Sequence, residues 1–141
     1  MSAEFELDPR LAADTAEIGR TSLSLVLLMN DARFPWIMLV PMRPAIRELY
    51  ELSTADAHRL LDESLLLGRL MGAQDPTAKL NVANLGNIVA QLHLHHVLRT
   101  PADAAWPGPV WGFGTRTGRS DAERTATLEF WRQQLAPLLD R

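Results

Sequence analysis

Three of the four histidines of this chain fall within four consecutive residues, at His93, His95 and His96, and the chain has no cysteine. The surrounding segment, QLHLHHVLR from Gln91 to Arg99, is typical of a β-strand, in which side chains alternate between two faces. Alternation puts His93 and His95 on one face together with Gln91. His96 then points to the opposite, leucine-rich face. Imidazoles that are neutral near pH 7 can attack phosphorus, hydrogen-bond a phosphate or bind a metal ion.

A metal site at this segment would need a third ligand from elsewhere in the chain. The spacing His93-x-His95 suits chelation, but no aspartate or glutamate lies between Gln91 and Leu98. The lack of cysteine also excludes disulfides, thiolate-ligated zinc and iron–sulfur clusters. We therefore expect no metal ligands among the site residues, and metal binding is the weaker alternative to phosphate chemistry.

Composition limits the partners of the chain. A length of 141 residues predicts one domain over residues 1–141, and a hydrophobic fraction of 47% predicts that it is folded. A formal net charge of −3 argues against nucleic acid as a partner. Met1–Arg20 is acidic rather than signal-like, and the apolar stretches Leu23–Met29 and Trp36–Met42 are too short to cross a bilayer. We expect a cytoplasmic protein with no membrane partner.

Local patterns predict the elements around the histidines. We expect helices over Phe5–Gly19, over Thr54–Met71 with Ser53 as its N-cap, and from Ser120 to about Leu138. We expect strands over Thr21–Asn30 and Trp36–Val40, paired as a hairpin, and over Lys79–Asn84 and Gln91–Arg99. This order predicts an α+β domain whose core spans about residues 20–112. Its sheet would have about five mainly antiparallel strands, with one main helix packed on it and a C-terminal helix over about residues 120–138.

The histidine segment resembles a known family motif. Gln91 to Val97 resembles His-φ-His-φ-His-φ-φ, where φ is apolar, the signature of the histidine-triad (HIT) nucleotide hydrolases and transferases. Gln91 stands in place of the first histidine, and His96 in place of an apolar residue. The order of elements is similar over about residues 23–111, as are the strand Trp36–Pro41 and the segment Asn81–Asn87. The resemblance is closest to the bacterial branch described as diadenosine-polyphosphate-hydrolase-like.

The resemblance implies a covalent mechanism. His93 would attack the α-phosphorus of a dinucleoside polyphosphate or nucleoside phosphoramidate, and water would then release the nucleotide from His93. His95 would donate to a phosphate oxygen. Gln91 would support the site by hydrogen bonding, because an amide cannot carry a proton charge. If that change has abolished the chemistry, the alternative is a non-catalytic nucleotide-binding module.

The resemblance also implies further binding residues and a partner. Asn30, Asn81, Gly86 and Asn87 would contact the nucleotide. Trp106, with Trp111 in the same Trp/Pro/Gly-rich loop, would form a wall of the active site or a subunit interface. We expect a homodimer that requires no cofactor, and a divalent metal bound to the substrate phosphates is compatible with this expectation.

Overall fold

A computed structural model describes residues 4–140 as three helices, five strands and one short 3-10 helix. In chain order these are α1 (Pro9–Asp14), β1 (Thr15–Arg20), β2 (Ser24–Met29), β3 (Trp36–Pro41), η1 (Leu49–Glu51), α2 (Thr54–Gly72), β4 (Lys79–Asn84), β5 (Leu94–Arg99) and α3 (Asp121–Gln134). The strands form a single antiparallel sheet in the order β1-β2-β3-β5-β4. The predicted α+β class and sheet type are confirmed.

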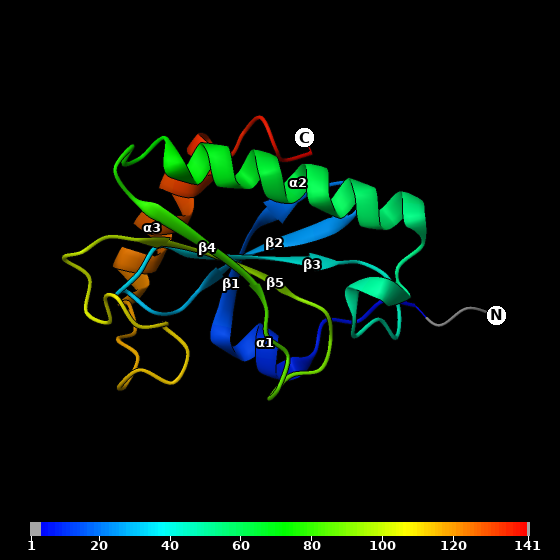
Figure 1. Ribbon diagram of the computed structural model, residues 1–141, viewed down its shortest axis with the longest axis horizontal. Coiled ribbons are helices and arrows are strands. Elements are labelled where there is room, and N and C mark those ends of the chain that lie inside the picture. The colour runs from blue at the N-terminus through cyan, green and yellow to red at the C-terminus, as the bar shows by residue number, and fades with distance from the viewer. Residues whose placement is uncertain (1–3, 141) are drawn as a thin grey trace.

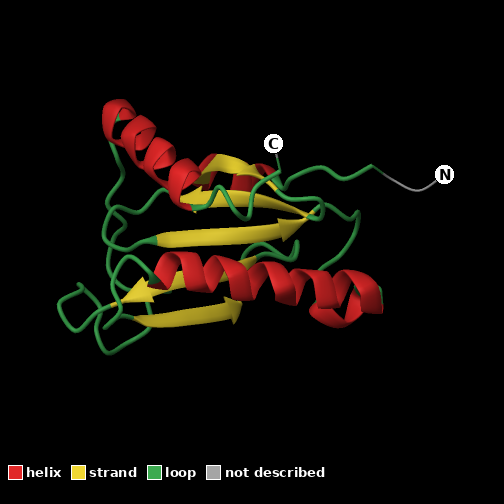
Figure 2. Cartoon of the chain, turned by 90° about the horizontal axis from the view of Figure 1, so that it is seen from above, coloured by secondary structure: helices red, strands yellow, loops and turns green. Residues whose placement is uncertain are grey.

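Both faces of the sheet are covered. Figure 1 shows α2 lying across one face and α1 on the other, and Figure 2 shows the strands side by side beneath α2. The first core contains Leu67 of α2, Trp131 of α3 and Leu94 of β5. The second core, on the opposite face, contains Leu11 of α1 and Val97 of β5. None of the helices within residues 4–140 is long and apolar enough to span a membrane.

The N-terminal region differs from the helix predicted over Phe5–Gly19. Only Pro9–Asp14 is helical, with Asp8 as the N-cap whose side chain accepts from the backbone amide of Arg10. From Thr15 onward the chain pairs with β2, and Ile18 of β1 is buried in the first core. Tertiary pairing has therefore overridden a local helical pattern, because the strand gains a ladder of hydrogen bonds and a buried apolar side chain.

The remaining predictions are mostly confirmed. The hairpin forms between β2 and β3, Ser53 caps α2, and β4 has the predicted bounds. β5 starts at Leu94 rather than at Gln91, and α3 ends at Gln134 rather than near Leu138. Side chains nevertheless alternate as predicted, because Leu92, Leu94 and Leu98 belong to the first core and Val97 to the second.

His96 joins β5 to α2 through the first core. Its Nδ1 lies 3.1 Å from the carbonyl oxygen of Leu94, which can only accept, so Nδ1 carries the proton. Its Nε2 therefore accepts from the hydroxyl of Ser64 on α2 at 2.7 Å. The imidazole has no exposed surface, and burial lowers its pKa to about 4. A neutral histidine thus ties the main helix to the histidine strand.

We predict that acidification destabilises the protein through His96. Its pKa in the folded state lies below the ordinary value of 6.5, so the unfolded chain binds a proton first and stability falls as the pH drops below that value. Between about pH 7 and pH 5 this group should lower the free energy of unfolding by about 2 kcal/mol. Urea unfolding at both pH values measures the effect.

The matched control for this prediction is the double variant His96→Leu with Ser64→Ala, which removes the buried imidazole and its partner together. The variant should lose less stability on acidification than the wild type, because only the remaining groups, including His95, still contribute. The same loss in both proteins would contradict the prediction.

Candidate functional site

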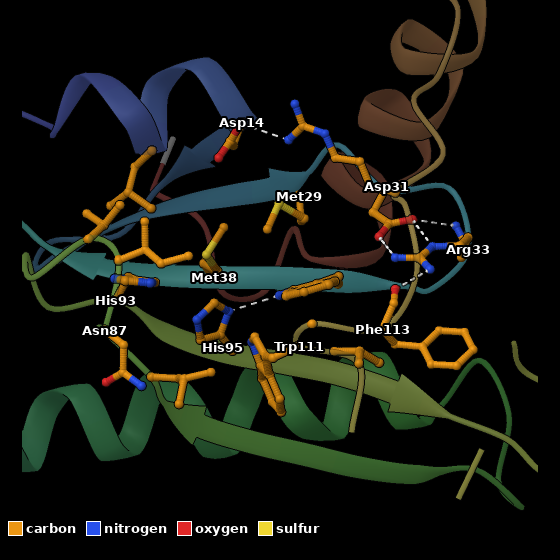
Figure 3. A pocket seen from close by; sticks show the side chains of 18 of the residues that line it. Asp14, Met29, Asp31, Arg33, Met38, Asn87, His93, His95, Trp111 and Phe113 are labelled. Atoms are coloured by element: carbon orange, nitrogen blue, oxygen red, sulfur yellow. Dashed lines mark hydrogen bonds and ion pairs between the residues drawn. The ribbon is translucent and has the colours of Figure 1, made fainter. Parts of the chain in front are cut away.

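His93 and His95 face a cavity of about 720 Å³ on the side of the sheet opposite α2 (Figure 3). The cavity lies between β2, β3, β5, the end of α1, the turn after β4 and the loop after β5. Its lining residues are Leu11, Asp14, Met29, Asp31, Arg33, Trp36, Met38, Leu85, Asn87, Ile88, Val89, His93, His95, Val110, Trp111, Gly112, Phe113, Gly114, Thr115 and Arg116. The structure therefore brings the two predicted histidines together in the wall of one cavity.

His93 lies immediately before β5, and one ring nitrogen is fixed by the backbone. Its Nδ1 is 2.6 Å from the carbonyl oxygen of Gln91. A carbonyl can only accept a hydrogen bond, so Nδ1 carries the proton. In the neutral ring Nε2 then has a free lone pair, which is the arrangement that a nitrogen nucleophile requires.

At His95, Nδ1 contacts a hydrogen-bond donor, whereas at His93 it contacts a carbonyl acceptor. Its Nδ1 is 3.0 Å from Nε1 of Trp36, while its Nε2 is buried and has no hydrogen-bond partner among residues 4–140. Its ring packs edge-on against Trp111 and against His93, with centroids 5.3 Å and 4.7 Å away. Burial, and then the neighbouring His93, lowers the pKa of His95 to about 3, so the ring is neutral at pH 7.

Two ion pairs fix the cavity walls. Arg33 contacts Asp31 at 2.8 Å and also donates to the carbonyl oxygen of Phe113 at 2.7 Å, which anchors the loop after β5. Burial alone would raise the pKa of Asp31, but hydrogen bonds from Arg33 and Thr117 hold it below its ordinary value. Arg116 of the same loop reaches Asp14 at 2.8 Å.

The path of that loop depends on glycine. Gly112 has a φ of +76° between Trp111 and Phe113, both of which line the cavity. Glycine adopts this left-handed conformation at much lower cost than residues with a side chain. The turn at Gly112 therefore lets two successive aromatic residues contribute to the same wall.

Gln91 lies beside the site but does not line the cavity. Its side-chain oxygen accepts from the backbone amide of Asp8 at 2.8 Å, and its side-chain nitrogen donates to the carbonyl oxygen of Glu6 at 2.8 Å. Both ends of the amide are therefore occupied by the N-terminal segment. Gln91 contacts His93 through its backbone carbonyl and holds the N-terminal segment with its side chain.

Of the other predicted binding residues, only Asn87 lines the cavity. Gly86 belongs to the same turn, where a Cβ would lie 2.9 Å from the carbonyl oxygen of Val89, so it keeps the turn compact. The Asn30 side chain accepts from the amide of Arg119 at 3.3 Å, near the start of α3.

Asn81 and Trp106 belong to a separate structural cluster around Arg99. The buried guanidinium of Arg99 donates to Asn81 at 3.0 Å and to both carboxylate oxygens of Asp103. It also lies 5.8 Å from the centre of a Trp106 ring. This cluster holds the start of the loop after β5, and neither Asn81 nor Trp106 lines the cavity, whereas Trp111 does.

Sequence reasoning missed several wall residues. Met38 pairs with His95 across the sheet, and Trp36 occupies the same face two residues earlier. Alternation along the predicted strand from Trp36 would have found both, had its register against the histidine strand been known. The Asp14–Arg116 pair joins residues 102 positions apart, and no local signal identifies it.

Within residues 4–140 no group of three or more histidine, aspartate or glutamate side chains is placed to hold a metal ion. His93 and His95 thus have no third protein ligand beside them in the described chain.

Comparison with known proteins gives consistent matches. The HIT domain family matches residues 10–102. A histidine triad protein from Marinobacter aquaeolei VT8 is 45% identical over 97% of both chains, with a TM-score of 0.89. One from Bradyrhizobium japonicum is 37% identical over 94% of this chain and 98% of its own, with a TM-score of 0.88. The diadenosine triphosphate hydrolase of Plasmodium falciparum, at 17% identity and a TM-score of 0.60, shares the fold. No curated protein matches the chain.

We predict that Gln91→Ala releases the N-terminal segment. Two hydrogen bonds to the backbone of Glu6 and Asp8 are lost, so hydrogen exchange over residues 6–8 should speed up and the free energy of unfolding should fall by about 1–2 kcal/mol. Exchange measured by mass spectrometry and urea unfolding check this. Asn87→Ala is the matched control, because Asn87 makes no side-chain hydrogen bond within residues 4–140. Unchanged hydrogen exchange in Gln91→Ala would show that these two hydrogen bonds do not hold the N-terminal segment in place.

Proposed function

Because this chain belongs to the HIT domain family, we propose that it is a nucleotide hydrolase or nucleotidyl transferase acting through a covalent intermediate on His93. The observation that carries the proposal is the 2.6 Å contact from His93 Nδ1 to the Gln91 carbonyl, which leaves Nε2 free toward the cavity. A neutral imidazole held in this tautomer is a competent nucleophile near pH 7.

In the proposed reaction, Nε2 of His93 attacks the α-phosphorus of a nucleotide. The phosphorus–nitrogen bond forms as the bond to the leaving oxygen or nitrogen breaks. Water then cleaves the phosphorus–nitrogen bond, which releases the nucleoside monophosphate and restores His93. Positioning and stabilisation of phosphate charge account for most catalysis of this kind.

His95 and the cavity walls have distinct roles in this proposal. The buried, unpartnered Nε2 of His95 lies in the cavity wall and suits a phosphate oxygen. The apolar side chains of Met29, Met38, Trp111 and Phe113 offer a surface for a nucleobase. Gln91 has no titratable group, so we expect the leaving group to take its proton from water.

The charges of the cavity favour a substrate of low charge. Its four charged side chains form two pairs, Asp14 with Arg116 and Asp31 with Arg33. Among the described lining residues, no arginine is left unpaired to hold a chain of extra phosphates. The phosphorus–nitrogen bond of a nucleoside phosphoramidate therefore fits this cavity better than a free dinucleoside polyphosphate does.

We further propose that the protein forms a homodimer through β4 and α2. β4 is an edge strand, and such edges commonly pair with another chain. A Cβ on Gly68 would lie 2.9 Å from Leu80, so this side of α2 faces β4. Leu61 and Leu65 precede Gly68 on the same side and are 57% and 51% exposed, and Val82 of β4 is 47% exposed. These side chains form an apolar surface beside the free edge.

We predict that His93→Ala abolishes turnover and adduct formation. Without the imidazole no phosphorus–nitrogen bond can form, so the rate should fall by at least about a thousandfold. The wild type should cleave adenosine phosphoramidates faster than diadenosine polyphosphates. Rapid quenching and intact-mass measurement should detect a nucleotidyl adduct on the wild type alone.

His58→Ala is the matched control, because His58 is an exposed histidine of α2 outside this cavity. It should retain both turnover and adduct. If the wild type binds a nucleoside monophosphate but cleaves neither substrate class and forms no adduct, the enzymatic proposal fails and a binding module is favoured.

We predict that Leu61→Asp with Leu65→Asp produces a monomer. Charged side chains would have to be buried without partners at the proposed interface, which is unfavourable. Light scattering should give twice the 15.7 kDa chain mass for the wild type and a single chain mass for the variant. Phe130→Asp, at an exposed residue of α3, should remain dimeric. A monomeric wild type at all concentrations tested would rule out the dimer.

A further inference from the structure

The indole of Trp36 contacts Nδ1 of His95 and leaves the other ring nitrogen, Nε2, without a hydrogen bond among residues 4–140. Trp36 is the first residue of β3, and Met38, two residues later, pairs with His95 across the sheet. Its Nε1 lies 3.0 Å from Nδ1 of His95. The indole is only 4% exposed and packs against Phe34 and Trp111, with ring centroids 6.4 Å and 5.9 Å away. The donor is therefore fixed in place by packing.

The chemistry of the two rings determines the position of the proton. An indole N–H can only donate, so Nδ1 of His95 must be the acceptor and must be unprotonated. In a neutral imidazole the proton then lies on Nε2, which is buried in the cavity wall near Leu85, with no hydrogen bond of good geometry to any of residues 4–140. His95 is thus left with a single function toward the cavity, which is to donate one hydrogen bond.

We propose that Trp36 is a positioning residue that locks His95 as the Nε2–H tautomer, so that His95 donates to its ligand and accepts no proton from it. The identity of the ligand, a phosphate oxygen, rests on the proposed function, whereas the lock itself does not.

The lock gives two adjacent imidazoles opposite roles. His93 and His95 have ring centroids only 4.7 Å apart. The Gln91 carbonyl holds the proton of His93 on Nδ1, and the Trp36 indole keeps the proton of His95 off Nδ1. One ring therefore presents a lone pair to the cavity, and the other presents an N–H.

The charge state of His95 agrees with this arrangement. Burial is the main cause that lowers its pKa to about 3, and His93 adds to the effect. The two carboxylates that line the cavity, Asp14 and Asp31, are each paired with an arginine. His96, on the opposite face of the sheet, also lowers the pKa of His95, and a contact with the Leu85 backbone partly opposes the shift. His95 accordingly stays neutral over roughly the range in which an ordinary histidine titrates.

Nitrogen NMR of the substrate-free protein tests the lock directly. Long-range proton–nitrogen spectra should show His95 protonated on Nε2 and unprotonated on Nδ1, with no titration between roughly pH 8 and pH 5. A nitrogen–nitrogen coupling between Trp36 Nε1 and His95 Nδ1 should be visible across the hydrogen bond. A proton on Nδ1, or no coupling, would overturn the proposal, and neither measurement requires a variant to fold.

Trp36→Phe and Trp111→Phe form a matched pair. Both indoles contact the His95 ring, but only that of Trp36 bonds to it. Trp36→Phe should give a mixture of the two His95 tautomers, while Trp111→Phe should keep the Nε2–H form. If Trp36→Phe also keeps that form, the lock is not supplied by Trp36.

Kinetics separate the lock from the proposed function. If the wild type turns over, kcat of Trp36→Phe should fall about tenfold with a smaller change in KM, because the donor would act mainly in the transition state. Turnover by a wild type whose His95 is protonated on Nδ1 would overturn the lock and leave the proposed function intact. The expected tautomer and coupling in a protein without turnover would support the lock and count against the enzyme.

Discussion

The side chains of β5 alternate between the two buried faces of the sheet, and both the site and the fold depend on this constraint. β5 lies between β3 and β4, and its successive residues His95 and His96 point in opposite directions. His95 meets the indole of Trp36 on one face, and His96 meets the hydroxyl of Ser64 on the other. A slip of one residue would exchange the faces and leave both buried imidazoles without their partners.

Backbone carbonyls and one indole determine which nitrogen of each buried histidine carries its proton. The carbonyls of Gln91 and Leu94 accept from Nδ1 of His93 and His96, whereas Trp36 donates to Nδ1 of His95. These contacts are made within the protein itself. The positions of these protons are therefore set by the protein before any ligand arrives.

The cavity walls come from segments far apart in the chain. Asp14 at the end of α1 pairs with Arg116, and Asp31 after β2 pairs with Arg33, which also holds the loop after β5. Gln91 adds a further link, from the histidine segment to the N-terminal segment. These contacts leave the walls firmly anchored with their charges balanced in pairs, a setting in which a neutral imidazole is stable.

The sequence by itself determined the features that depend on local periodicity. Alternation from Gln91 to Leu98 separated His93 and His95 from His96, and helical spacing after Ser53 located α2, because both patterns repeat between near neighbours. Only the tertiary structure decided that Thr15–Arg20 is a strand. It also decided that the Gln91 side chain hydrogen-bonds to the backbone of Glu6 and Asp8. Asn81 likewise accepts a hydrogen bond from Arg99 and does not line the cavity. Those outcomes depend on partners up to 85 residues away in the sequence. A hydrogen bond between residues so far apart produces no repeating pattern of residue types from which it could be predicted.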